Sequence, residues 1–194
     1  KMVIIHGMTG NAHNWDLVVP AFLGQYHVIV PTVRGRGQSD YSPDGAYNQS
    51  DYQADLEALV EHLRLDKFVL VGSSMGGSIS MLYAATHPSK IEKLIVVDMG
   101  VRSANSVPVQ AQGPDRIRDA REEFDSPQDA ISWARQFDLY AKVSEDAMRH
   151  LVTYCFKPLA NGKITWGYDR KLREQRRQAG VDFVSQYVDI SEKV

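Results

Sequence analysis

The chain of 194 residues contains 43% hydrophobic and 24% charged residues, and its formal net charge at pH 7 is −2. This composition is typical of a folded globular protein and excludes a disordered or fibrous chain. The near-neutral charge argues against nucleic-acid binding, and the longest apolar runs are far shorter than the roughly 20 residues of a membrane-spanning helix. The single cysteine, Cys155, excludes a disulfide framework within these residues and a cysteine-based zinc site. We therefore expect a soluble, cytoplasmic protein that binds neither nucleic acid nor a membrane.

Strand and helix patterns alternate through the first half of the chain. Short runs rich in valine and isoleucine predict buried strands at residues 2–6, 27–32, 67–72 and 93–98. Helical spacing of apolar residues predicts helices at 15–23, 51–65 and 76–87, and Ser50 with Gln53 forms a plausible capping box for the second helix. Continuous apolar strands that alternate with helices predict a mainly parallel sheet covered on both faces, which is a doubly wound α/β fold.

The character of the sequence changes after Gly100. Residues 101–189 show no good strand run, and their apolar spacing is helical, so we expect a helical subdomain. Ser126 followed by Pro127 predicts one helix start, and Ser144 predicts another. Residues 160–163, Ala-Asn-Gly-Lys, have the composition of a turn.

The segment Gly72-Ser73-Ser74-Met75-Gly76, which we call the elbow, joins a predicted strand to a predicted helix. Ligands of open α/β sheets sit at the carboxyl ends of strands, where this segment lies. Only Ser74 has glycine both two residues before and two residues after it, as the motif G-x-S-x-G requires. A sharp turn strains the central residue and leaves no room for side chains at the two glycines. Ser74 is therefore the candidate nucleophile, and the Met75 N–H at the helix start could stabilise an oxyanion.

Other interpretations of these glycines have to be weighed. The glycine spacing of a phosphate-binding P-loop is present from Gly72 to Gly77, but Ser78 stands in the place of the required lysine. The dinucleotide motif G-x-G-x-x-G does not match at either candidate position. When the motif starts at Gly72, Ser74 replaces its second glycine, and when it starts at Gly35, Asp40 replaces its third. A tight strand-to-helix turn that merely contains a serine remains the simplest alternative.

Three further motifs occur in the chain besides the elbow. The first strand runs into His6-Gly7-Met8, the second is followed by Val33-Arg-Gly-Arg-Gly-Gln-Ser39, and the fourth ends in Val96-Val97-Asp98. In this order the motifs resemble the α/β-hydrolase fold superfamily over essentially the whole chain. The resemblance implies that residues 6–8 form an oxyanion loop, in which the Met8 N–H is the second oxyanion donor and His6 is not the base. It also implies a core at 1–100, a helical cap at 101–189, and the start of the return to the core at 190–194.

The chain departs from this family in its acid and base. The family order is Ser, acid, His, but only His87 and His150 follow Ser74, and neither ends a predicted strand. We therefore expect this sequence to be a piece of a longer chain, with two strands before it and the base-bearing strands after it. Asp98 is the acid at a strand's carboxyl end and is a possible triad acid, although such an aspartate also commonly binds nearby backbone N–H groups.

A further departure from the family concerns the loop after the second strand. Thr32 stands where relatives often carry aspartate, which is expected to deprive Arg34 of a possible partner.

Ser74, the central residue of the elbow, limits the types of reaction that the family resemblance implies. Epoxide hydrolases and dehalogenases of this fold carry aspartate there, so Ser74 implies acyl transfer, with hydrolysis of a carboxylic ester, lactone or related small-molecule carbonyl substrate. No metal and no organic cofactor is implied. The alternatives are a carbon–carbon bond hydrolase of diketo acids and a non-catalytic binding protein on the same scaffold. We expect these residues alone to be inactive, with open sheet edges.

Overall fold

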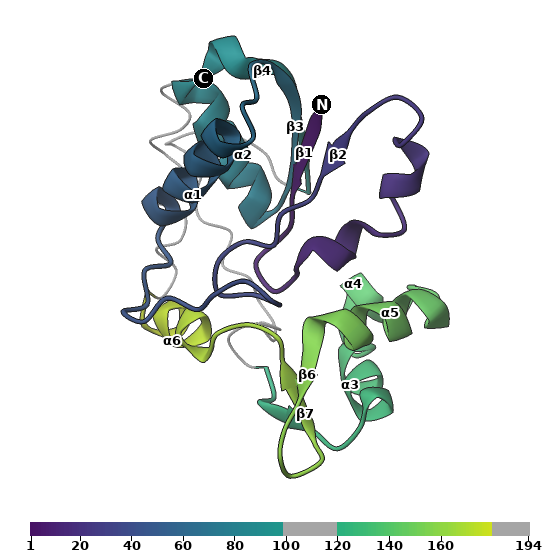
Figure 1. Ribbon diagram of the computed structural model, residues 1–194. Helices are drawn as coiled ribbons and strands as arrows, with labels where there is room; N and C mark the ends of the chain where they lie inside the picture. The colour runs from purple at the N-terminus through teal and green to yellow at the C-terminus, as the bar shows by residue number, and fades with distance from the viewer. Residues whose placement is uncertain (99–119, 180–194) are drawn as a thin grey trace, which may run out of the picture.

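The computed structural model describes residues 1–98 and 120–179, the last four by their backbone only. The first range contains a four-stranded sheet in which every neighbouring pair is parallel (Figure 1). Its spatial order is β2-β1-β3-β4, with β1 at Met2–Ile5, β2 at Val28–Ile29, β3 at Phe68–Ser73 and β4 at Ile91–Val97. The predicted parallel α/β sheet is confirmed, and β2 is shorter than its apolar run.

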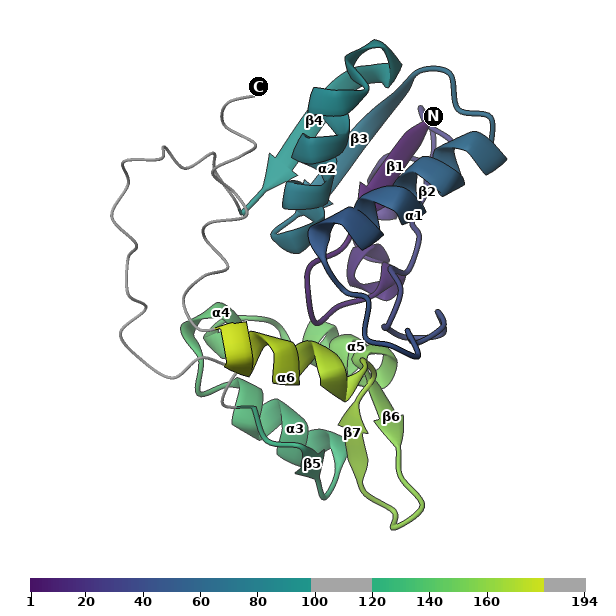
Figure 2. The same cartoon turned by 90° about the vertical axis from the view of Figure 1, so that its left-hand side faces the viewer.

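Side chains of the sheet alternate between two apolar cores. Val3 and Ile5 face α1 (Gln49–His62) and α2 (Met75–Thr86), which lie along one side of the sheet (Figure 2). Met2 and Ile4 belong to the core on the opposite side, where the chain from Trp15 to Tyr26 packs. This period of two is expected of a strand that is buried on both faces.

Two predictions about helices in this region are wrong. The predicted helix at 15–23 is instead a pair of 3₁₀ turns, η1 (Ala12–Trp15) and η2 (Val19–Ala21). Pro20 explains the difference, because proline has no N–H to donate and its ring clashes with the carbonyl four residues earlier in an α-helix. The predicted capping box of α1 is also displaced, since the Asp51 carboxylate accepts a hydrogen bond from the Asn48 N–H at 2.7 Å.

The second described range, residues 120–179, was predicted to be helical, but it contains both helices and strands. It contains the helices α3 (Pro127–Ala134), α4 (Asp138–Ala141), α5 (Glu145–Cys155) and α6 (Arg170–Ala179). It also contains an antiparallel sheet in the order β5-β7-β6, formed by β5 (Glu123–Phe124), β7 (Ile164–Trp166) and β6 (Phe156–Pro158). These strands of two or three residues are too short to show an alternating pattern. None of the helices in the described ranges is long and apolar enough to cross a membrane.

Several local predictions for the second range are confirmed. The Ser126 hydroxyl accepts a hydrogen bond from the Asp129 N–H and so caps α3, and the Ser144 hydroxyl caps α5 in the same way. Residues 160–163 form the turn between β6 and β7, where Gly162 has a φ of +81°. Cys155 ends α5 and is buried, and this burial raises the pKa of its thiol to about 12.

The second range lies beyond the carboxyl ends of the parallel strands (Figure 1). Backbone hydrogen bonds join it to the loop after β2, because the Gly37 N–H donates to the Gly167 carbonyl at 2.7 Å and the Asp169 N–H donates to the Gly35 carbonyl at 2.8 Å. Arg36 and Tyr168 form the antiparallel bridge between these two bonds. The residues that cover the sheet end are thereby tied to the loop that carries Arg36.

Candidate active site

Ser74 is the single residue between β3, which ends at Ser73, and α2, which begins at Met75. Its φ of 50° and ψ of −115° lie in a region that non-glycine residues rarely adopt. Two backbone hydrogen bonds hold this conformation: the Ser74 N–H donates to the Val97 carbonyl, and the Ser78 N–H donates to the Ser74 carbonyl. The residue is exposed, and its hydroxyl does not cap α2. A strained backbone therefore presents an alcohol at the carboxyl edge of the sheet.

The two glycines of the elbow have no room for a side chain. A Cβ at Gly72 would overlap the Gly76 carbonyl group, and a Cβ at Gly76 would overlap the Ile5 carbonyl and lie 2.7 Å from the His6 carbonyl oxygen. A Cβ at Gly7 would lie 3.7 Å from the Ser74 Cβ. The elbow is therefore packed directly against residues 6–8, the expected oxyanion loop.

His6 holds the oxyanion loop through both of its ring nitrogens. The Val33 N–H donates to Nε2 at 2.9 Å, so Nε2 must be the unprotonated nitrogen, and Nδ1–H donates to the Gly7 carbonyl at 2.7 Å. The side chain is fully buried, and this burial lowers the pKa of His6 to about 4. A neutral histidine with both nitrogens engaged fits the structural role that its place in the motif implies.

Met8 and Met75 are the two expected oxyanion donors, and both lie close to Ser74 along the chain or in the fold. Met8 follows Gly7, whose Cα borders Ser74, and Met75 is the first residue of α2. The first N–H groups of an α-helix have no partner within the helix, and they carry the positive end of its dipole. A carbonyl oxygen that gains negative charge during attack by Ser74 could be stabilised by such groups.

Asp98 lies beside the elbow, directly after the end of the neighbouring strand β4. The register of β3 and β4 pairs Ser73 with Val97, so Asp98 follows at the position next to Ser74. Asp98 is exposed and has a φ of 58°. No hydrogen bond from a residue within the described ranges reaches its carboxylate, so its backbone is near the candidate nucleophile, and none of the described residues holds its side chain there.

The two histidines after Ser74 have other partners. His87 lies at the far end of α2, where its ring stacks on Tyr83 at 4.5 Å. His150 on α5 contacts the His13 carbonyl at 3.0 Å and the Asp16 carboxylate at 3.2 Å. In the part of the chain that the structure describes, no hydrogen bond joins a histidine to Ser74.

Sequence reasoning missed two arginine interactions in the loop after β2. Arg34 was expected to lose a partner because Thr32 replaces aspartate, yet its guanidinium donates twice to the Asp55 carboxylate of α1, at 2.5 Å each. That expectation is wrong, because an acid on a different element takes the role. Arg36 lies between two glycines with positive φ, a pattern typical of an exposed turn, but only 1% of Arg36 is exposed.

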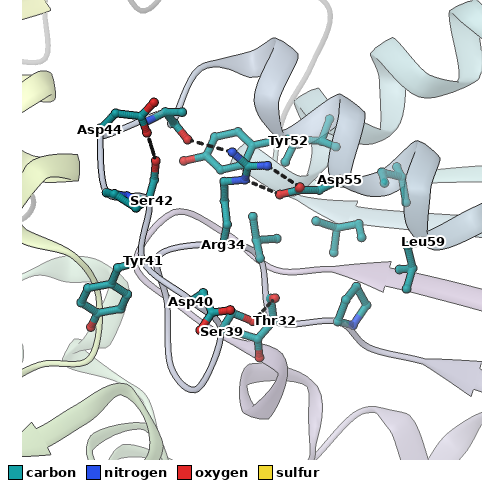
Figure 3. Close-up of a pocket in the computed structure, with 17 residues that line it drawn as sticks. Thr32, Arg34, Ser39, Asp40, Tyr41, Ser42, Asp44, Tyr52, Asp55 and Leu59 are labelled. Atoms are coloured by element: carbon teal, nitrogen blue, oxygen red, sulfur yellow. Dashed lines mark hydrogen bonds and ion pairs between the residues drawn. The ribbon is translucent and has the colours of Figure 1, made fainter.

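A cavity of about 610 Å³ lies between α1 and the loop after β2 (Figure 3). Its wall contains the Arg34–Asp55 pair, whose charges neutralise each other, and an apolar part that includes Leu56 and Leu59. Large pockets are the default candidates for ligand sites, but neither Ser74 nor Met8 lines this one. We therefore place the candidate site at the elbow, where the strained serine is.

Comparison with known proteins finds hydrolases that are similar to this chain. A 3-hydroxybutyrate-oligomer hydrolase from Cupriavidus necator is 36% identical over 106 residues, which make up 54% of this chain and 36% of that protein. A soluble epoxide hydrolase from a Corynebacterium species is 31% identical over 111 residues, covering 56% and 38% of the two chains. The crystal structure of an alpha/beta hydrolase from Novosphingobium aromaticivorans superposes with a TM-score of 0.76 at 28% identity, and the match covers 88% of this chain and 60% of that one.

These matches span less than two thirds of each of the three proteins. The model of the alpha/beta hydrolase fold family matches residues 2–159, and this range includes the oxyanion loop, the elbow and much of the second region. The chain therefore belongs to the alpha/beta hydrolase fold family.

Proposed function

We propose that the protein is a serine hydrolase that cleaves a carboxylic ester, lactone or related carbonyl substrate by acyl transfer to Ser74. The observation that carries this proposal is the exposed Ser74 in its strained conformation, next to the oxyanion loop and at the start of α2. Relatives that are named as hydrolases support the reaction class. Serine at the elbow, where epoxide hydrolases of this fold carry aspartate, supports acyl transfer in particular.

The proposed reaction begins when the Ser74 Oγ attacks the substrate carbonyl carbon. The carbonyl oxygen becomes an oxyanion that accepts hydrogen bonds from the Met8 and Met75 N–H groups. Collapse of this intermediate expels the alcohol and leaves an ester between the acyl group and Ser74. Water then attacks the acyl-enzyme, which releases the carboxylic acid and restores the serine. A general base must accept the Ser74 proton and return it to the leaving alcohol.

Fluorophosphonate labelling tests the role of Ser74 directly. The protein is expressed with any sequence that flanks it in its gene, and labelling is followed by mass spectrometry alongside turnover of p-nitrophenyl esters and lactones. We expect one label on Ser74, no label in Ser74→Ala, and a loss of kcat on the order of a millionfold in that variant. Ser73→Ala is the matched control, because it removes the adjacent hydroxyl but should keep both label and turnover.

The proposal fails if the folded protein takes no label, or if Ser74→Ala is labelled as strongly as the unchanged protein. A folded protein without label or turnover would instead support the binding-protein alternative. Label without ester or lactone turnover would keep the nucleophile but reject this substrate class.

A further inference from the structure

Arg36 is a buried cation that acts as a hydrogen-bond donor to several elements. Its guanidinium donates to the Arg34 carbonyl at 2.7 Å and to the Tyr52 hydroxyl at 2.7 Å, and it lies 5.0 Å from the centre of the Tyr52 ring. Within the described ranges, no carboxylate forms an ion pair with it. Asp169 is linked to it only indirectly, because that carboxylate accepts from the hydroxyl of Tyr47, whose ring centre is 5.9 Å from the guanidinium.

The other contacts of Arg36 reach both proposed oxyanion residues. Its Nε donates to the Met8 carbonyl at 3.0 Å, and its Nη2 contacts the Met75 sulfur at 3.2 Å. The preceding peptide group, which carries the Met8 N–H, is held by a different residue, because its carbonyl, that of Gly7, accepts from His6. One guanidinium thus connects the oxyanion loop to the first residue of α2.

The charge of Arg36 adds to this geometry. A buried charge without an opposite charge beside it acts over a longer range than the same charge in water, because the surrounding dielectric constant is low. Burial is the main cause of the lowered pKa of His6, and the charge of Arg36 also lowers it, as expected for a positive charge close to residues 6–8. Positive potential that is present before reaction stabilises a developing oxyanion without reorganisation.

We propose that Arg36 is a positioning residue for the oxyanion hole, in which it fixes the Met8 loop against the start of α2 and supplies positive potential behind them. This inference rests on the proposed function. It predicts that Arg36 contributes to binding of the transition state more than to binding of the substrate.

The test compares Arg36→Met and Arg36→Lys with the unchanged protein, using a p-nitrophenyl ester and a phenylboronic acid that forms a tetrahedral anion on serine. For Arg36→Met we expect kcat to fall about 100-fold and the boronate inhibition constant to rise by a similar factor, as for loss of one oxyanion donor. The KM should change less than about threefold, because ground-state binding does not use the oxyanion contacts. Arg36→Lys keeps the positive charge but loses the planar guanidinium with its several N–H donors. We therefore expect kcat and the boronate inhibition constant of this variant to change by about tenfold.

Arg34→Met is the matched control. It removes a neighbouring arginine that pairs with Asp55 and that has no side-chain contact with Met8 or Met75 in the described ranges. We expect it to lower the melting temperature but to leave kcat and boronate inhibition within threefold. Circular dichroism establishes that each variant is folded.

A folded Arg36→Met with kcat and boronate inhibition within threefold of the unchanged protein would overturn the inference. If that variant does not fold, the same result for Arg36→Lys overturns it. An equal loss of boronate affinity in the Arg34 control would also reject a specific role for Arg36. Failure of the proposed function is distinct, because the unchanged protein would then show neither fluorophosphonate label nor turnover.

Discussion

The two sides of Ser74 are built very differently. On the side of the oxyanion loop, His6 and Arg36 are buried, and each donates to a carbonyl that flanks the Met8 N–H. On the side of β4, Asp98 is exposed, and the preceding Val97 is 40% exposed. Within the described residues, the groups that would stabilise charge are preorganised, whereas no group that would transfer the proton is in place. The electrostatic and proton-transfer parts of the proposed catalysis can therefore be probed separately.

The largest expected effect comes from the close packing of the elbow against β1. In Gly76→Ala the new methyl group would meet the Ile5 and His6 carbonyl groups, which belong to a buried strand and its extension and cannot move aside. We expect a loss of at least about 4 kcal/mol in the free energy of unfolding, or no folded protein. Urea denaturation measures it.

Gly24→Ala is the control for this substitution, because nothing lies within 4 Å of a Cβ at that position. We expect its midpoint of denaturation to stay close to that of the unchanged protein. A Gly76→Ala protein as stable as the Gly24→Ala protein would show that the elbow is not tightly packed against the oxyanion loop.

A smaller effect should follow from the protonation of His6. The pKa of His6 is lowered from 6.5 to about 4 in the folded state, so between these values the unfolded chain binds the additional proton. The free energy of unfolding should therefore fall as the pH decreases from 6.5 towards 4, with a contribution from His6 of about 3 kcal/mol. Denaturation at a series of pH values measures this slope.

His6→Gln should flatten that slope, and His62→Gln, which replaces an exposed histidine at the end of α1, is the matched control. An unchanged slope in His6→Gln would mean that the oxyanion loop is not held by a neutral histidine. The contrast between the two sides of Ser74 would then lose its main support.

The smallest expected effect is that of Asp98. Triad acids are buried and hydrogen-bonded to their histidine, whereas Asp98 is exposed and its carboxylate has no hydrogen bond from the described residues. We expect Asp98→Asn to lower kcat on a p-nitrophenyl ester less than tenfold. A loss of about 10⁴-fold, the size expected for a triad acid, would instead identify Asp98 as that acid and place proton-transfer chemistry next to the elbow.

Predictions from the sequence succeeded where the pattern is local. The strands β1, β3 and β4 are continuous apolar runs, and α2 directly follows the elbow, so period and glycine spacing sufficed to locate them. The predictions were wrong where a single residue interrupts a helix and where short strands pair over a long distance in the sequence. Pro20 breaks the helix predicted around it, and β5 and β7 pair although about 40 residues separate them.

The amino-acid sequence alone was sufficient to indicate the parallel α/β sheet, the family resemblance and Ser74 as the candidate nucleophile, because these depend on residues that are neighbours in the chain. Only the tertiary structure decided which partners Arg34 and Arg36 have. Arg34 and Asp55 are 21 residues apart, and Arg36 and Met75 are 39 residues apart. Such partners meet only in the folded chain, where Arg36, an arginine in a glycine-rich turn, is buried against the Met8 carbonyl.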